Sequence, residues 1–387
     1  MKKIFLLAFL CICLVFLSAC GNQHTSDGSS ESAMSTQNTQ APSGGVSPLG
    51  LRYSVNADGK TCTITRGGLY PIAELIIPSE LDGYTVTAIG DGAFSSCFDL
   101  TSIELPETVT AIGNGAFLYC NQLTSIYIPE GVQTIGVSAF ANCMKLKSIT
   151  IPNSVTRLGT VESEEDYMLS NYEGLFSNCN ALETVVIGNG VEKIEDYTFY
   201  YCVSLKNVKL GSGVKYIGVQ AFFTCSRLEN IELPENLMTL DDEAFYECRS
   251  LKSIVIPHSV TQLGYHVFRK CLALESAEIG NGITVLPEGT FEFCNKLTTI
   301  RLGECLETIG RYAFSGCVAL NGMELPKTVK QIEENAFDTC RALKSIRYKG
   351  TKAEWEAIEK HSDWNQFWKQ LPTDVKTIVC SDGEITF

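Results

Sequence analysis

The chain of 387 residues contains 17 cysteines, whose thiols are chemically reactive. Cysteine can cross-link a fold as a disulfide, bind zinc as a thiolate or act as a nucleophile. Eleven cysteines share one local pattern, in which a phenylalanine lies three residues before the cysteine and a leucine three residues after it. These eleven are Cys97, Cys120, Cys143, Cys179, Cys202, Cys225, Cys248, Cys271, Cys294, Cys317 and Cys340.

The pattern recurs every 23 residues, except once, where Phe140 and Phe176 are 36 residues apart. A single insertion of 13 residues, near 160–172, accounts for that difference. Such a fixed period is typical of proteins that stack one supersecondary unit on the next. Neighbouring cysteines would then lie about one strand spacing apart, roughly 4.7–4.9 Å.

The stacked arrangement indicates whether the cysteines form disulfides, bind zinc or remain free thiols. Their Cβ vectors would run parallel, which is poor geometry for a disulfide, and eleven is an odd number. No histidine accompanies the pattern, so a tetrahedral zinc site is not expected. We therefore expect buried free thiols that pack as small hydrophobic groups. A disulfide framework, common in exported proteins, is the alternative. Cys62, Cys305 and Cys380 lie outside the pattern and stay unassigned.

Catalysis and nucleic-acid binding have little support in the sequence. The four histidines, His24, His258, His266 and His361, are scattered, and no metalloprotease, serine-hydrolase or phosphate-loop motif is present. A net charge of −14 disfavours a nucleic-acid partner, because such proteins present a basic surface. We expect no enzymatic activity, no cofactor and no metal, although paired carboxylates could serve a hydrolase.

The elements that position these side chains are short. After each leucine an alternating stretch such as Ile103-Glu104-Leu105 predicts a half-buried strand, and proline or glycine ends it. A second apolar pair follows, then usually glycine, and then the phenylalanine opens a turn of helix. Because Pro287 takes the glycine slot in one copy, that slot does not require a left-handed backbone. No copy can bury its own apolar residues, so the fold class is a repeat solenoid with parallel β-sheet and short helical or 3-10 turns.

The unit resembles the BspA-like (Treponema pallidum-type) leucine-rich-repeat surface proteins, through the motif A-F-x-x-C-x-x-L-x-x-I-x-[IL]-P that runs from Ala93 to Pro106. The resemblance implies a right-handed coil over residues 72–348 with about eleven copies. It also implies an N-terminal capping hairpin at 48–71, with an Asp58-Gly59 turn, and a C-terminal cap at 349–387. Members of this family are cell-surface interaction proteins and not enzymes.

The N-terminus carries an export signal. Residues 1–19 combine Lys2 and Lys3 with an apolar run too short to span a bilayer, which indicates a signal peptide. Residues 17–21 resemble the lipobox of bacterial lipoproteins, which implies lipidation of Cys20 and anchoring at the outside of the membrane. An ordinary signal cut near Ala19, or an uncleaved anchor, is the alternative. Residues 20–47 are polar and predict a disordered tether.

Two surfaces are candidates for partner binding. The first is the outward face of the predicted sheet, and its candidates are Tyr127, Val186, Lys209, Val255, Arg301 and Arg347. The second is the insertion, in which Glu164, Asp166, Tyr167 and Tyr172 could hold a ligand. A solvated sheet face and a solvated loop are the plain alternatives. Aromatic residues after the repeat phenylalanines could be contact points, or could simply pack between repeats; these are Tyr119, Tyr200, Tyr201, Phe223, Tyr246 and Phe293.

The function that follows is non-catalytic binding or adhesion at the cell surface, by protein–protein recognition on the solenoid. The alternative is capture of glycans or peptides in support of nutrient uptake. Exposed aromatic platforms would favour a glycan, and an extended sheet of mixed charge favours a protein. The expected partner is an extracellular protein or glycan, and the membrane is contacted only through the lipid.

Overall fold

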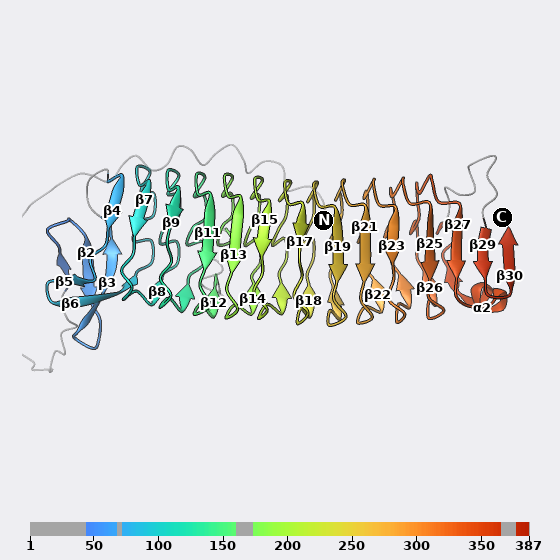
Figure 1. The fold of residues 1–387 in the computed structure, drawn as a ribbon, viewed down its shortest axis with the longest axis horizontal. Coiled ribbons are helices and arrows are strands. Elements are labelled where there is room, and N and C mark those ends of the chain that lie inside the picture. The colour runs from blue at the N-terminus through green and yellow to red at the C-terminus, as the bar shows by residue number, and fades with distance from the viewer. Residues whose placement is uncertain (1–43, 68–71, 160–172, 365–376, 387) are drawn as a thin grey trace, which may run out of the picture. The chain divides into compact units, whose positions relative to one another are not determined.

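The computed structural model describes residues 44–67, 72–159, 173–364 and 377–386. The predicted signal peptide, the lipidated Cys20 and the inserted residues 160–172 lie outside these ranges. Within them, no helix is both long and apolar enough to cross a membrane. The predicted solenoid is confirmed, and its β-strands form two series that run along its length (Figure 1).

The first series holds one strand after each recurring leucine, as predicted, and begins with a strand that precedes the first repeat. Among the described residues it is divided into four short sheets, within which strands of successive coils pair in parallel in constant register, as in Ser253↔Ser276 and Ser276↔Thr299. The series consists of β4 (Glu74–Ile76), β7 (Ser102–Glu104), β9 (Ser125–Ile126), β11 (Ser148–Ile151), β13 (Thr184–Ile187), β15 (Asn207–Lys209), β17 (Asn230–Ile231), β19 (Ser253–Ile256), β21 (Ser276–Ile279), β23 (Thr299–Arg301), β25 (Gly322–Leu325) and β27 (Ser345–Tyr348).

The second series is formed by the apolar pair that follows proline or glycine. Most of its strands have only two residues, and they also pair in parallel from repeat to repeat. The series consists of β6 (Tyr84–Ile89), β8 (Ala111–Ile112), β10 (Thr134–Ile135), β12 (Arg157–Leu158), β14 (Lys193–Ile194), β16 (Tyr216–Ile217), β18 (Thr239–Leu240), β20 (Gln262–Leu263), β22 (Val285–Leu286), β24 (Thr308–Ile309), β26 (Gln331–Ile332) and β28 (Glu359–Lys360).

The core is a continuous stack of the repeat phenylalanines. The eleven rings from Phe94 to Phe337 are buried and nearly parallel, and neighbouring ring centroids lie 5.1–5.7 Å apart. The ring of Trp364 covers the C-terminal end of the stack edge-on, at 6.1 Å from Phe337. At the other end Gly67 packs so closely against Phe94 that an added Cβ atom at this glycine would lie 2.6 Å from the ring. Both ends of the stack are therefore closed.

The five residues after each repeat phenylalanine form a segment that we call the phenylalanine turn. The expected helical turn is absent here: the only regular helix in the described residues is α2 (Lys352–Ala357). Backbone bonds between residues three apart do form, as from the Cys120 N–H to the Phe117 carbonyl at 3.1 Å. However, the second residue of all eleven turns has a positive φ, between 56° and 76°, and a left-handed residue interrupts a right-handed helix.

The glycine position that follows each second-series strand does not require a left-handed backbone, as the presence of Pro287 in one copy indicates, with one exception. Gly113 and Gly136 do not have positive φ, whereas Gly159 has φ of 69°. Glycine is favoured at Gly113 and Gly136 by close approach, because an added Cβ would lie within about 2.6 Å of the preceding coil's backbone. Glycine there lets successive coils come together.

Hairpins and a helix cap the solenoid. At the N-terminal end β2 (Arg52–Val55) and β3 (Thr61–Arg66) form an antiparallel hairpin, and β3 pairs with β6. β1 (Gly45–Val46) pairs with β2, so ordered structure begins inside the segment predicted as tether. β5 (Glu80–Leu81) pairs with β6.

At the C-terminal end, Thr351 and Glu354 form a capping box at the start of α2, and Trp355 on that helix is fully buried. β29 (Thr377–Cys380) continues the first series and pairs with β30 (Gly383–Thr386) in a closing hairpin.

Candidate functional site

The first candidate surface is the outward face of the first strand series. The cross-strand register aligns Thr150, Val186 and Lys209 in one row, and Val255, Glu278 and Arg301 in a continuation of it. Val255 is 58% exposed, although it lies between the buried Ile254 and Ile256. The predicted outward orientation is therefore correct for these positions, whereas a binding role stays a prediction.

The other predicted positions on this face are also accessible. Tyr127, which directly follows β9, is 56% exposed. The side chains of Arg301 and Arg347 are 76% and 67% exposed. Val186 is less accessible, being half-buried between Thr150 and Lys209. The structure thus brings the six predicted sheet residues onto one face, spread over many coils and not gathered in a single pocket.

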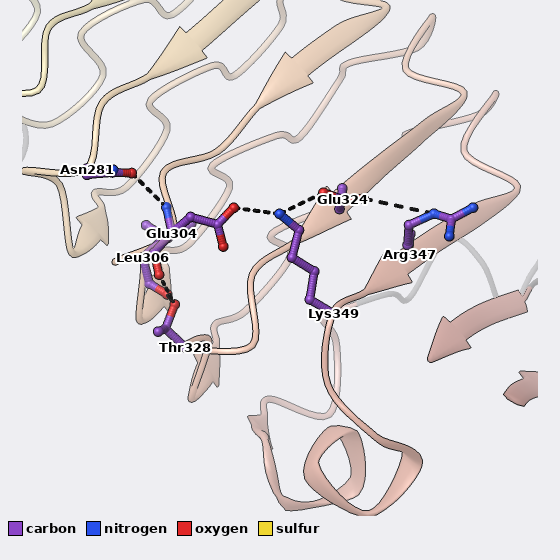
Figure 2. Close-up of polar contacts among 7 residues, drawn as sticks. All are labelled: Asn281, Glu304, Leu306, Glu324, Thr328, Arg347 and Lys349. Atoms are coloured by element: carbon purple, nitrogen blue, oxygen red, sulfur yellow. Dashed lines mark hydrogen bonds and ion pairs between the residues drawn. The ribbon is translucent and has the colours of Figure 1, made fainter. Parts of the chain in front are cut away.

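Charges on this face are paired across coils. Figure 2 shows Lys349 between Glu304 and Glu324, and its Nζ lies 2.9 Å from Glu324 Oε1. The Arg347 Nε lies 3.9 Å from Glu324 Oε2, and Arg301 Nη1 lies 3.4 Å from Glu278 Oε1. Exposed pairs of this kind contribute about 0–1 kcal/mol each, so the fold does not depend on them. These side chains remain available to a partner.

The insertion cannot be assessed as a site, because Glu164, Asp166, Tyr167 and Tyr172 lie outside the described residues. The chain that resumes at Glu173 is held firmly. The Glu173 carboxylate accepts hydrogen bonds from the Tyr119 hydroxyl at 3.0 Å and from Asn142 Nδ2 at 2.8 Å. Glu173 is therefore fixed against the solenoid.

The phenylalanine turns form a second surface, in which aromatic rings stack from coil to coil. The Phe223 ring lies 5.1 Å from Tyr200 and 4.8 Å from Tyr246, with interplanar angles of 22° and 7°. Tyr201 leans against Tyr200 and Phe223 with tilted rings. Because Phe223 has a ring against each face, its exposed part is the ring edge. The interpretation of these aromatics as packing between repeats is supported at Phe223.

Cations continue this row. The Arg269 guanidinium lies 5.9 Å from the Tyr246 ring centroid and 5.8 Å from that of Phe293. The Lys270 ammonium lies 5.1 Å from the Tyr246 centroid. All three distances are in the range of cation–π attraction. The aromatic residues were predicted from the sequence and these cations were not, although the 23-residue period places them in the same row.

Two carboxylates lie beneath the cations. Glu247 binds both Arg249, at 2.6 Å, and Lys270, at 2.8 Å. Burial would raise the pKa of Glu247, but the hydrogen bonds from Lys270 and Arg249 outweigh it and lower that pKa. Glu292 lies 2.8 Å from Arg269 Nε, and burial raises its pKa. The Glu247 and Glu292 side chains are only 15% and 10% exposed, so the solvent meets mainly the cations.

The cysteines form no reactive or metal-binding centre among the described residues. All fourteen described cysteines are free, and ten of the eleven in the repeat pattern are buried, whereas Cys97 is half-buried. Ten thiols of the repeat pattern donate a hydrogen bond to the phenylalanine carbonyl of the preceding coil, as from Cys225 Sγ to the Phe199 oxygen at 3.2 Å. Burial raises the pKa of these thiols strongly, which keeps them protonated. Packing as free thiols was predicted; the hydrogen bond was not.

Among the described residues, His258 has a partner in an adjacent coil. His258 Nδ1 accepts the backbone N–H of Asn281 at 3.0 Å, a bond that Asn189 and Asn281 repeat in other coils with their amide oxygens. No group of three or more histidine, cysteine, aspartate or glutamate side chains in the described ranges could hold a metal ion. His258 is thus a structural residue that links adjacent coils.

A comparison with family models agrees with this architecture. A family model described as "BspA type Leucine rich repeat region (6 copies)" matches residues 72–162, 170–298 and 263–362. A leucine-rich repeat protein from Bacteroides ovatus is 26% identical, with 81% of this chain and 97% of that chain covered and a TM-score of 0.47. A leucine-rich cell surface protein from Faecalibacterium prausnitzii is 29% identical, with coverage of 84% and 99% and a TM-score of 0.43.

A leucine-rich repeat protein from T. pallidum is 24% identical, with 70% of this chain and 89% of that chain covered and a TM-score of 0.28. No curated protein matches the chain. The family model covers well over half of the sequence, and its boundaries coincide with the stacked coils. The chain therefore belongs to the BspA-type leucine-rich-repeat family.

Proposed function

We propose that this protein is a non-catalytic binding protein of the bacterial cell surface, which recognises another protein through the exposed surface of its solenoid. One observation carries the proposal. Inward positions of the strands are apolar and nearly all buried, whereas the outward positions vary in size and charge and are mostly exposed, as at Tyr127, Val255 and Arg301. The fold fixes the first set and leaves the second set free for recognition.

The rigidity of this face also supports protein recognition. Each strand of the first series is held by its neighbours through backbone pairing, so the outward side chains are positioned before a partner arrives. Preorganisation of this kind lowers the entropic cost of association. Exposed tyrosine, valine and arginine side chains on one surface form the mixture of apolar and charged contacts found in protein interfaces.

A glycan is a less suitable partner for the aromatic residues. Sugars stack on the free face of an aromatic ring, and both faces of Phe223 are covered by Tyr200 and Tyr246. Phe223, at the centre of the stacked turn aromatics, therefore does not offer the open ring face that glycan capture would need. Adhesion to a protein is accordingly the function that the geometry supports best.

The export signal completes the proposal. Lipidation of Cys20 would hold the solenoid at the membrane, and the polar residues that follow would lift it away from the bilayer. Mass spectrometry of the mature N-terminus tests this part: a diacylglyceryl group on Cys20 is expected. An unmodified N-terminus that begins at Cys20 or beyond would contradict the anchor and would leave the binding proposal intact.

An array of extracellular proteins and glycans, probed with the purified protein, tests the binding function. We expect selective binding to a protein and none to neutral glycans. Val255→Asp, on the proposed face, should weaken that binding at least about fivefold, because an apolar contact residue contributes roughly 1–3 kcal/mol when buried. Val285→Asp is the matched control, since Val285 is 45% exposed and lies on β22 of the other series.

Three results would contradict the proposal. Binding to glycans alone would support the nutrient-capture alternative. Hydrolysis of an arrayed substrate that tracks with the purified protein would show an enzyme. Equal loss of binding in Val255→Asp and Val285→Asp would show that the first strand series is not the recognition face.

A further inference from the structure

The phenylalanine turns that follow Phe199, Phe222, Phe245, Phe268 and Phe291 form a surface whose charge is opposite to that of the chain. These five turns contain five cations and two carboxylates, whereas the whole chain has a net charge of −14. The cations are Arg227, Arg249, Arg269, Lys270 and Lys296. We call this surface, together with its aromatic residues Tyr200, Tyr201, Phe223, Tyr246 and Phe293, the basic aromatic ridge.

The cations, and not the carboxylates, are the charged groups that a partner of the ridge would meet. Glu247 and Glu292 are largely covered, and both are bound by cations of the ridge. Arg227 and Lys296 are exposed, and no ion pair within the described part of the chain engages them. A positive surface on an acidic protein attracts an acidic partner and repels other copies of the same acidic chain.

The aromatic rings strengthen this preference. Stacked rings turn their edges to the solvent, and the edge of an aromatic ring carries partial positive charge. Phe223 is stacked on both faces, so only its edge can meet a partner. The Arg269 guanidinium lies over the Tyr246 and Phe293 rings, and the Lys270 ammonium lies over the Tyr246 ring. Carboxylates are therefore favoured over sugars at this surface, and the ring edges also provide apolar area.

The backbone makes the ridge rigid. The Tyr201 N–H donates to the Phe223 carbonyl at 2.9 Å, the Thr224 N–H to the Tyr246 carbonyl at 2.8 Å, and the Glu247 N–H to the Arg269 carbonyl at 2.9 Å. Each turn is thus fixed on the next. Tyrosine and arginine held in place are the residue types that most often dominate protein-binding energy.

We propose that the basic aromatic ridge docks an acidic segment of a partner protein in which aspartate or glutamate alternates with apolar residues. This inference rests on the proposed function and adds to it the location and the chemistry of the partner. The occupant follows from charge complementarity: five cations, stacked ring edges and covered carboxylates on a rigid surface.

The experiment uses a fluorescein-labelled peptide in which Glu-Phe-Asp-Leu is repeated three times, titrated with the purified full chain. A control peptide has lysine in place of every acidic residue, and heparin serves as an anionic glycan competitor. We expect the acidic peptide to bind, the lysine peptide not to bind, and the affinity to fall as salt rises. Stronger competition by heparin than by unlabelled acidic peptide would overturn the proposal in favour of a glycan.

The double variant Arg227→Glu with Lys296→Glu tests the location. Both side chains are exposed, so the fold should persist, which the urea midpoint checks. We expect acidic-peptide binding at least about tenfold weaker, because two attractive contacts become repulsive. The matched control is Arg52→Glu with Lys60→Glu, which makes the same change of charge at exposed positions in the N-terminal hairpin and should bind like the wild type.

The outcomes separate this inference from the proposed function. The docking proposal would be overturned if the ridge and control variants bound the peptide with equal affinity, or if the wild type did not bind the acidic peptide. If the protein array nevertheless gives a partner whose binding depends on Val255, protein recognition stands and its location is the sheet face. If the array gives no protein partner, the proposed function fails by itself.

Discussion

Replacement of Phe245 by alanine measures how much the stacked core contributes to the free energy of unfolding. Phe245 is fully buried, and its ring lies 5.1 Å from Phe222 and 5.6 Å from Phe268. Phenylalanine-to-alanine changes in protein cores cost about 3–5 kcal/mol. The upper end is expected here, because backbone bonds from coil to coil keep the neighbouring rings from closing the cavity.

Urea denaturation of the purified protein, followed by circular dichroism, provides the assay. We expect Phe245→Ala to lower the free energy of unfolding by about 3–5 kcal/mol with little change in the slope against urea. Val255→Ala is the control, since it is an exposed position on the sheet and should change stability by less than about 0.5 kcal/mol. A loss below about 1 kcal/mol for Phe245→Ala would refute the stacked-core account.

The remaining predictions concern thiols, pH and the caps. In native protein an aromatic disulfide reagent should react rapidly with the exposed Cys305, whereas the buried thiols of the repeat pattern should react only after unfolding, with or without reductant; rapid native reaction of many thiols would contradict this. Burial raises the pKa of Cys225 and its equivalents, so above about pH 8.5 the unfolded chain loses protons that the folded chain keeps. The urea concentration at the unfolding midpoint should therefore decrease as the pH is raised from 8 to 10. Trp355→Ala should cost about 3–5 kcal/mol and increase amide exchange in the last coils. Lys330→Ala, which removes an exposed pair with Glu307, should cost less than about 1 kcal/mol by urea denaturation.

Periodicity made the repeat fold predictable from the sequence. The 23-residue spacing located the first strand series, the buried phenylalanines and the outward positions, because a side chain that recurs in every unit must occupy the same place in every coil. Pro287 likewise indicated that the glycine slot does not require a left-handed backbone, which holds for Gly113 and Gly136.

The turns were harder to predict. Their second residue is left-handed in all eleven copies, yet only Gly316, Asn142 and Asn178 are of types that favour that conformation, and the others include Tyr119, Glu247, Lys270 and Phe293. Tertiary packing imposes the conformation there, and the local sequence does not reveal it. The same packing brings the cations of the basic aromatic ridge together, since their proximity depends on the coil and not on neighbours in sequence.

The junction between Phe140 and Phe176 has a wider consequence. These two residues are 36 positions apart, yet their rings lie 5.5 Å from each other and the Cys179 thiol still reaches the Phe140 carbonyl at 3.1 Å. Every other step of the stack achieves the same geometry with 23 positions. The contacts between adjacent coils are therefore the same whether 23 or 36 positions separate the two phenylalanines, so additional chain at this corner leaves the stack undisturbed.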